Sequence, residues 1–178
     1  MRRLLFITFF ICLPLFETRA FRVATHNMAL KKEQDIPQKM ARALKERGIS
    51  LDVLFLQEIR KNMGQQMMDA FEMKGAFIRR PEDAEAIGLL SAHPFDYTNS
   101  LSLKTRDPLG FTRAALMAEI KLPSLGTVRL INTHLAYREE AELIRLRQLS
   151  EILQWMEKRQ KEHSVDVIFL GGDLNATP

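Results

Sequence analysis

Two apolar segments, far apart in the chain, constrain the fold more than any other feature. Residues 51–58 read Leu-Asp-Val-Leu-Phe-Leu-Gln-Glu, and residues 165–173 read Val-Asp-Val-Ile-Phe-Leu-Gly-Gly-Asp. Short runs rich in β-branched and aromatic side chains predict strands, and we expect residues 167–170 to be buried on both faces. Each segment follows a predicted helix. This repeat predicts an α/β fold, a sheet built from two related halves with helices outside.

Periodicity and turn residues place the other elements. Helices are predicted at residues 31–47, 62–73 and 139–162, with Asp35 as the cap of the first and Gly75 closing the second. Further strands are predicted at residues 21–25, 86–91, 97–103, 111–122 and 127–132. We expect the strands at 86–91 and 97–103 to form a hairpin around His93-Pro94. The predicted apolar stripe of the third helix comprises Leu146, Leu149, Ile152, Leu153 and Met156.

The first 20 residues have the pattern of a secretory signal peptide. Two arginines precede residues 4–16, which carry no charge, and small residues follow at Thr18 and Ala20. This stretch is shorter than the roughly 20 apolar residues that span a membrane, and Pro14 interrupts it. We therefore expect cleavage after Ala20, one domain at residues 21–178, no stable membrane insertion, and a secreted or periplasmic location.

Cleavage would also remove the only cysteine, Cys12. The mature chain could then form no disulfide and offer no thiolate to zinc. The net charge would fall from +4 to +2, because three arginines and Glu17 leave with the peptide. Attraction to phosphate would then depend on local clusters. The candidates lie between residues 60 and 113: Arg60, Lys61, Arg79, Arg80, Lys104, Arg106 and Arg113.

Polar residues follow four of the predicted strands. They are Asn27, Glu58, His134, and Asp173 with Asn175. Strand ends are where layered α/β proteins build their sites, and an extended backbone would turn Asp173 and Asn175 to the same side. The alternative for this pair is an ordinary Asx turn. Oxygen donors with one imidazole favour Mg²⁺, which needs only one or two carboxylates besides substrate phosphate, so Glu58 assisted by Asn27 would suffice as an anchor.

The order of four short motifs resembles the endonuclease/exonuclease/phosphatase superfamily. These motifs are Thr25-His-Asn27, Gln57-Glu58, Asn132-Thr-His-Leu135 and Gly172-Asp-Leu-Asn175. The resemblance implies a four-layer α/β sandwich, in which two mixed sheets pack face to face with helices outside. It also implies hydrolysis of a phosphoester by water, with Mg²⁺ or Mn²⁺ as the cofactor.

The resemblance also implies a role for each matching residue. Glu58 corresponds to the metal carboxylate, and Asn27 to a residue that positions metal, phosphate or nucleophile. His134 and Asn175 correspond to donors to phosphate oxygens. Asp173 corresponds to the group that orients or deprotonates the attacking water.

The substrate is less constrained than the chemistry. Arg113 is either a phosphate contact or one member of a surface charge pair. Export favours an extracellular or periplasmic nuclease acting on nucleic acid. The alternatives are a sphingomyelinase-like or inositol-phosphate phosphoesterase, for which Leu109 and Phe111 hint at an apolar hairpin, and an inactive binding protein of the same fold.

Family members carry further strands after the segment matched by residues 172–175. Those strands supply another metal-site aspartate and an Asp-His pair, and neither follows Asn175 in this sequence. The resemblance therefore leads us to expect a domain with its C-terminal part missing. We expect residues 21–178 alone to be poorly soluble and at most weakly active.

Overall fold

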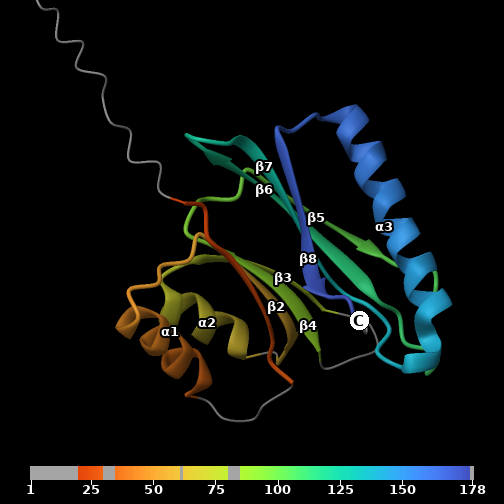
Figure 1. The fold of residues 1–178 in the computed structure, drawn as a ribbon, viewed down its shortest axis with the longest axis horizontal. Helices are drawn as coiled ribbons and strands as arrows, with labels where there is room; N and C mark the ends of the chain where they lie inside the picture. Colours follow the sequence, from red (N-terminus) through yellow and green to blue (C-terminus); the bar gives the residue numbers. More distant parts are fainter. Residues whose placement is uncertain (1–19, 30–34, 61, 80–84, 177–178) are drawn as a thin grey trace, which may run out of the picture.

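The computed structural model describes residues 20–29, 35–60, 62–79 and 85–176, which form two four-stranded mixed sheets with helices outside (Figure 1). The predicted signal peptide, apart from Ala20, lies outside these residues, as do Lys61 and Arg80 of the basic cluster. Within the described ranges, no helix is long and apolar enough to cross a membrane.

The first sheet has the strand order β1-β2-β4-β3. Its strands are β1 (Val23–Asn27), β2 (Val53–Ile59), β3 (Lys74–Arg79) and β4 (Ala86–Ser91). β1 and β2 are parallel, and helix α1 (Ile36–Glu46) connects them, whereas β4 runs antiparallel to both of its neighbours. Helices α1 and α2 (Met63–Phe71) pack on the outer face of this sheet.

The second sheet has the order β5-β6-β7-β8. Its strands are β5 (Tyr97–Ser102), β6 (Ala114–Leu122), β7 (Gly126–His134) and β8 (Val167–Asp173). β7 and β8 are parallel, and they are connected through a short 3₁₀ turn (Glu139–Ala141) and helix α3 (Glu142–Glu162). Each sheet therefore contains one β-helix-β unit, as the repeat in the sequence predicts.

The inner faces of the two sheets form the central core. Val53 and Phe55 of β2 point into it, whereas Leu54 and Leu56 point outward to α1 and α2, as the two-residue period of a strand requires. The second sheet contributes alternate residues of β6 and β7. The predicted four-layer α/β sandwich is confirmed.

Some local predictions are wrong. β4 and β5 belong to different sheets, so residues 92–96 cross between sheets and form no hairpin. Asp35 occupies the predicted N-cap position of α1, but its side chain makes no capping hydrogen bond; its Oδ2 pairs with Lys39 Nζ at 2.8 Å. Helix α2 ends at Phe71 with Glu72 as its C-cap, whose φ is +55°, and Gly75 lies inside β3, a strand the sequence did not predict. A Cβ at Gly75 would come within 2.6 Å of Met68 Sδ and of the Phe77 ring, so a larger residue there would require these side chains to shift.

Two predicted burial patterns are also wrong. Every residue of β8 is only partly buried, because among the described strands β8 lies at a sheet edge beside β7 alone. On α3, Leu146 and Leu153 are 55% and 43% exposed. Ile152 is buried as predicted, but the other buried residues of α3 are Arg145 and Gln148.

Candidate active site

The two parallel strand pairs end at one edge of the sandwich. Asn27 pairs with Gln57 at the end of β1 and β2, and His134 pairs with Asp173 at the end of β7 and β8. β8 packs against β1 and β2, which brings the two ends together. An open cavity of about 560 Å³ lies there. It is lined by Asn27, Glu58, Glu85, Leu109, Phe111, Arg113, His134, Tyr137, Asp173 and Asn175.

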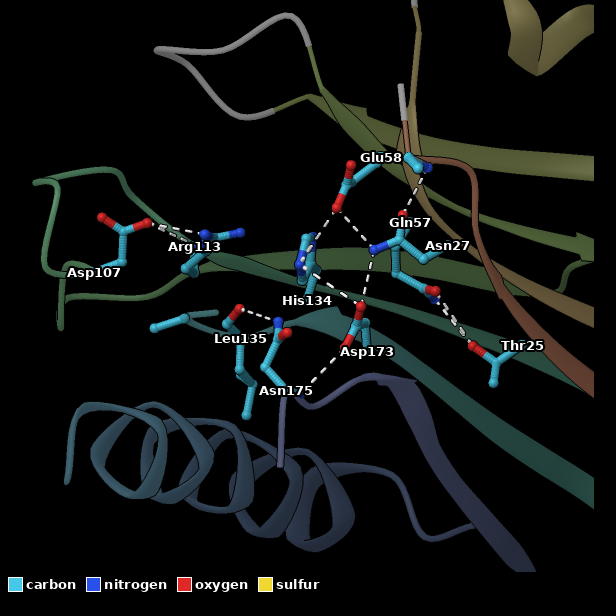
Figure 2. Close-up of polar contacts among 12 residues, drawn as sticks. Thr25, Asn27, Gln57, Glu58, Asp107, Arg113, His134, Leu135, Asp173 and Asn175 are labelled. Atoms are coloured by element: carbon cyan, nitrogen blue, oxygen red, sulfur yellow. Dashed lines mark hydrogen bonds and ion pairs between the residues drawn. The ribbon is translucent and has the colours of Figure 1, made fainter. Parts of the chain in front are cut away.

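All the site residues predicted from the sequence therefore line the same cavity. The Asn27 amide lies between Glu58 and Asp173 and joins the two sheets (Figure 2). Its Nδ2 donates to Glu58 Oε1 and to Asp173 Oδ2, both at 2.8 Å, while its Oδ1 accepts from the backbone N–H of Ala29. In this arrangement Asn27 presents a donor to the two carboxylates. It therefore bridges the carboxylates, while its Oδ1 faces the backbone of Ala29.

Glu58 reaches the cavity through a break in the β2 ladder. The pairing of β2 with β4 shifts between Leu56 and Ile59, and Glu58 has a φ of +53°. A non-glycine residue in this left-handed region costs about 1–3 kcal/mol, which the surrounding structure must offset. The sequence predicted the polar residues at this strand end but not the bulge that positions Glu58.

His134 lies between the two carboxylates and is only 5% exposed. Its Nε2 is 3.9 Å from Glu58 Oε1 and 4.0 Å from Asp173 Oδ2. A protonated imidazole would thus be paired with both carboxylates. The position suits a proton donor to an anionic oxygen held in the cavity.

Asp173 and Asn175 form the Asx turn and also meet at the site. The backbone does not stay extended, since Gly172 and Asn175 have φ values of +123° and +49°. Asp173 Oδ1 accepts from the Asn175 N–H at 3.0 Å, and Asn175 Nδ2 donates to Leu135 O at 3.0 Å. Gly172 is required because a Cβ would lie 2.0 Å from Thr133 O.

Arg113 is paired, but the pair is buried and not on the surface. Its side chain is 3% exposed, and its Nε and Nη2 donate to Asp107 Oδ2 at 3.2 and 2.9 Å. Its Nη1 is buried and makes no hydrogen bond within the described structure. Because Arg113 lines the cavity, Nη1 is the donor available to an incoming anion.

Asp107, Glu85 and Tyr137 were not predicted as parts of the site. Asp107 had a usable signal, because Asp-Pro-Leu-Gly at residues 107–110 is a typical turn sequence. Glu85 and Tyr137 belong to no motif. Of the basic cluster predicted to attract phosphate, only Arg113 lines the cavity among its described members.

A buried amide network lies directly beneath the cavity. Asn132 of β7 donates from Nδ2 to the carbonyls of Leu56 and Gly88 in the opposite sheet, at 2.9 and 2.7 Å. Its Oδ1 accepts from Gln57 Nε2 at 2.8 Å, and Gln57 also bonds Thr25. The network joins the two sheets next to Glu58 and His134. It therefore holds the two sheets at a fixed spacing beneath the site.

Helix α3 holds the loop that contains Tyr137. Arg145 Nη1 donates to the carbonyls of Ala136 and Arg138, at 3.2 and 2.5 Å. Gln148 Oε1 accepts from the Ala136 N–H at 3.0 Å. The polar residues on the buried face of α3 thus satisfy loop backbone groups that would otherwise lack partners.

The same helix holds the start of the loop that leads to Arg113. Gln148 Nε2 donates to Thr105 O at 3.0 Å, and the Glu151 carboxylate accepts from the N–H groups of Lys104 and Thr105. Burial alone would raise the pKa of Glu151, but the hydrogen bonds from Thr105 and Lys104 lower it below its usual value. Glu151 is therefore held as a carboxylate at neutral pH.

The chemistry of the donors bears on the metal that the resemblance implies. Within the described ranges, no three His, Asp or Glu side chains form a closed metal cage. Mg²⁺ does not require one, since it keeps several waters and takes one or two carboxylates besides substrate phosphate oxygens. Glu58, with a side chain 22% exposed at the cavity, fits that role.

No protein-family model and no curated protein sequence matches the chain. Solved structures do match. TDP2 from Caenorhabditis elegans is 20% identical with a TM-score of 0.61, over 79% of this chain and 42% of that one. ANGEL2, a 2′,3′-cyclic phosphatase solved with adenosine-2′,3′-vanadate, is 19% identical with a TM-score of 0.65, over 85% and 47%. A mannosyl-6-phosphatase from Bacteroides thetaiotaomicron is 13% identical with a TM-score of 0.71, over 89% and 67%.

Together, the two sheets form an α/β sandwich with one shared cavity at their strand ends. The matching proteins are members of the endonuclease/exonuclease/phosphatase superfamily, and the chain has the fold of that superfamily. The chain spans only 42% of the length of the TDP2 structure and 47% of that of ANGEL2.

Proposed function

We propose that the protein is a divalent-metal-dependent phosphoester hydrolase, and specifically an exported nuclease that cleaves phosphodiester bonds with water. The observation that carries the proposal is the convergence of Glu58, His134, Asp173 and the buried Arg113 on one cavity. Carboxylates beside phosphate donors are what phosphoryl transfer requires, since it depends on charge neutralisation and a positioned nucleophile.

The names of the similar structures support a phosphate-bearing substrate. ANGEL2 is a 2′,3′-cyclic phosphatase, the human Nocturnin catalytic domain was solved with a bound sulfate anion, and the bacterial neighbour is a mannosyl-6-phosphatase. The predicted export signal favours nucleic acid outside the cytoplasm. For this chain, both the nucleic-acid substrate and the secreted or periplasmic location are part of the proposal.

Each residue has a task that its position allows. Arg113 Nη1 and His134 Nε2 would donate to non-bridging phosphate oxygens, and the second N–H of the Asn175 amide would add another donor. Asp173 would orient the attacking water and accept its proton, while Asn27 holds Asp173 beside Glu58. Mg²⁺ or Mn²⁺ held by Glu58 would neutralise charge on the phosphate oxygens.

One specific observation favours a second substrate class. Leu109 and Phe111 are exposed at the cavity, 47% and 37% respectively, as a phospholipid phosphoesterase would require. An inositol phosphate substrate would need only the basic groups of the cavity and not these apolar side chains. An inactive binding protein of the same fold would retain the cavity without turnover.

A substrate panel tests the proposal. The purified protein is incubated with DNA, RNA, sphingomyelin and inositol phosphates, in Mg²⁺ or Mn²⁺, and compared with Glu58→Gln. Metal-dependent cleavage of a nucleic acid that Glu58→Gln lacks supports the nuclease. Cleavage confined to sphingomyelin or inositol phosphates would contradict it. Calorimetric titration with Mg²⁺ in both proteins identifies a binding protein without turnover.

Export has its own test. N-terminal sequencing of the protein recovered from a secreting host should begin at Phe21. Recovery of the uncleaved chain from the cytoplasm alone would contradict the proposed location.

A further inference from the structure

Three large apolar side chains line the candidate active site while remaining exposed. Leu109, Phe111 and Tyr137 are 47%, 37% and 51% exposed. Exposed apolar side chains gathered in a cavity otherwise lined by charged and amide side chains are typical of a ligand-binding site. The proposed hydrolysis uses none of the three.

These side chains are held in place by hydrogen bonds to their loops. Asp107 Oδ1 accepts from the backbone N–H groups of Leu109 and Phe111, both at 2.9 Å, while its Oδ2 binds Arg113. One buried carboxylate therefore supports both the apolar pair and the arginine. The spacing between the phosphate donor and the apolar surface is thereby fixed.

Tyr137 belongs to a second supported loop. The carbonyls of its neighbours Ala136 and Arg138 both accept from Arg145. The Arg138 guanidinium lies 5.8 Å from the centre of the Tyr137 ring. Two loops therefore bring aromatic rings to the cavity.

We propose that Leu109, Phe111 and Tyr137, which we call the apolar lip, bind the planar base of a nucleotide phosphoester. The proposal rests on the proposed function and names the group that accompanies the phosphate. Aromatic rings favour a flat partner with a π face. An acyl chain would need a continuous apolar trough, whereas the rest of this cavity is polar. A base stacked on an aromatic residue contributes about 1–3 kcal/mol, so its loss should raise KM by about 5- to 150-fold.

Two phosphodiesters with the same leaving group test the apolar lip. One is the p-nitrophenyl ester of thymidine 5′-phosphate, and the other is ethyl p-nitrophenyl phosphate, which has no base. Phe111→Ala and Tyr137→Ala should raise KM for the thymidine ester at least 5-fold more than for the ethyl ester, with little change in kcat. Phe111→Tyr, which keeps the ring, should restore KM. Leu143→Ala is the matched control, because Leu143 is exposed on α3 and does not line the cavity.

Each other outcome has a defined meaning. Equal changes in KM for both esters would overturn the base assignment, and so would a preference for dodecyl p-nitrophenyl phosphate that Phe111→Ala abolishes. If the protein with Mg²⁺ cleaves neither ester, the proposed function fails. Calorimetric titration then tests whether the apolar lip binds a base. Tighter binding of thymidine 5′-monophosphate than of ethyl phosphate, lost in Phe111→Ala, would support it. Equal affinities would overturn it.

Discussion

Replacing Asn132 with alanine should destabilise the protein by about 3 kcal/mol or more. The side chain is fully buried and makes three hydrogen bonds, two to carbonyls of the opposite sheet and one from Gln57. Alanine would leave the carbonyls of Leu56 and Gly88 and the Gln57 amide without these partners. Each buried polar group left unsatisfied costs about 1–3 kcal/mol, so three such groups set the lower estimate.

Equilibrium unfolding in urea measures this loss. The single tryptophan, Trp155 on α3, reports the transition by fluorescence. Asn99→Ala is the control, because Asn99 is an exposed strand residue and its replacement should change stability by no more than about 0.5 kcal/mol. A loss below about 1 kcal/mol for Asn132→Ala, with an unchanged m value, would refute the reasoning, since it would mean that water replaces the amide without cost.

Three further predictions concern the site and its support. Asp173→Asn should lower turnover by about 10²-fold or more at nearly unchanged KM, as loss of a general base does; an unchanged rate would remove Asp173 from the mechanism. Glu58→Gln should raise the metal concentration that gives half-maximal activity, and an unaltered metal titration would argue against Glu58 as a ligand. Glu151→Gln should destabilise the protein at neutral pH but less in acid. The folded-state pKa of Glu151 is lowered by hydrogen bonds from Thr105 and Lys104, so its contribution is present above about 4.5 and is lost as the pH falls through the lower folded-state value. Urea unfolding of both proteins between pH 3 and pH 7 measures this, and a constant difference would contradict it.

The sequence predicts the strand ends of the site well. Parallel strands joined by a helix must end at the same edge, so Asn27 with Glu58, and His134 with Asp173, follow from local patterns. The packing of the two sheets brings the two pairs together, and this packing was predicted only from the resemblance to the superfamily. The crossing from β4 to β5 was missed because a loop sequence does not specify which sheet receives the next strand.

The remaining site residues depend on tertiary contacts. Asp107 has the signature of a turn, yet nothing local indicates that its second oxygen binds Arg113. The bulge at Glu58 depends on the pairing of β2 with β4. The leucines of α3 suggested its buried face, but the structure buries Arg145 and Gln148 there, because the adjacent loops present backbone groups that need partners.

Gln148 accepts a hydrogen bond from the loop that contains Tyr137, at Ala136, and donates one to the loop that leads to Arg113, at Thr105. The two loops therefore cannot move independently, since any shift of the Gln148 amide displaces both. Variants selected for a new substrate preference should accordingly include changes on the buried face of α3 as well as in the cavity. A change of substrate specificity in this protein would then require substitutions in a helix that does not contact the substrate.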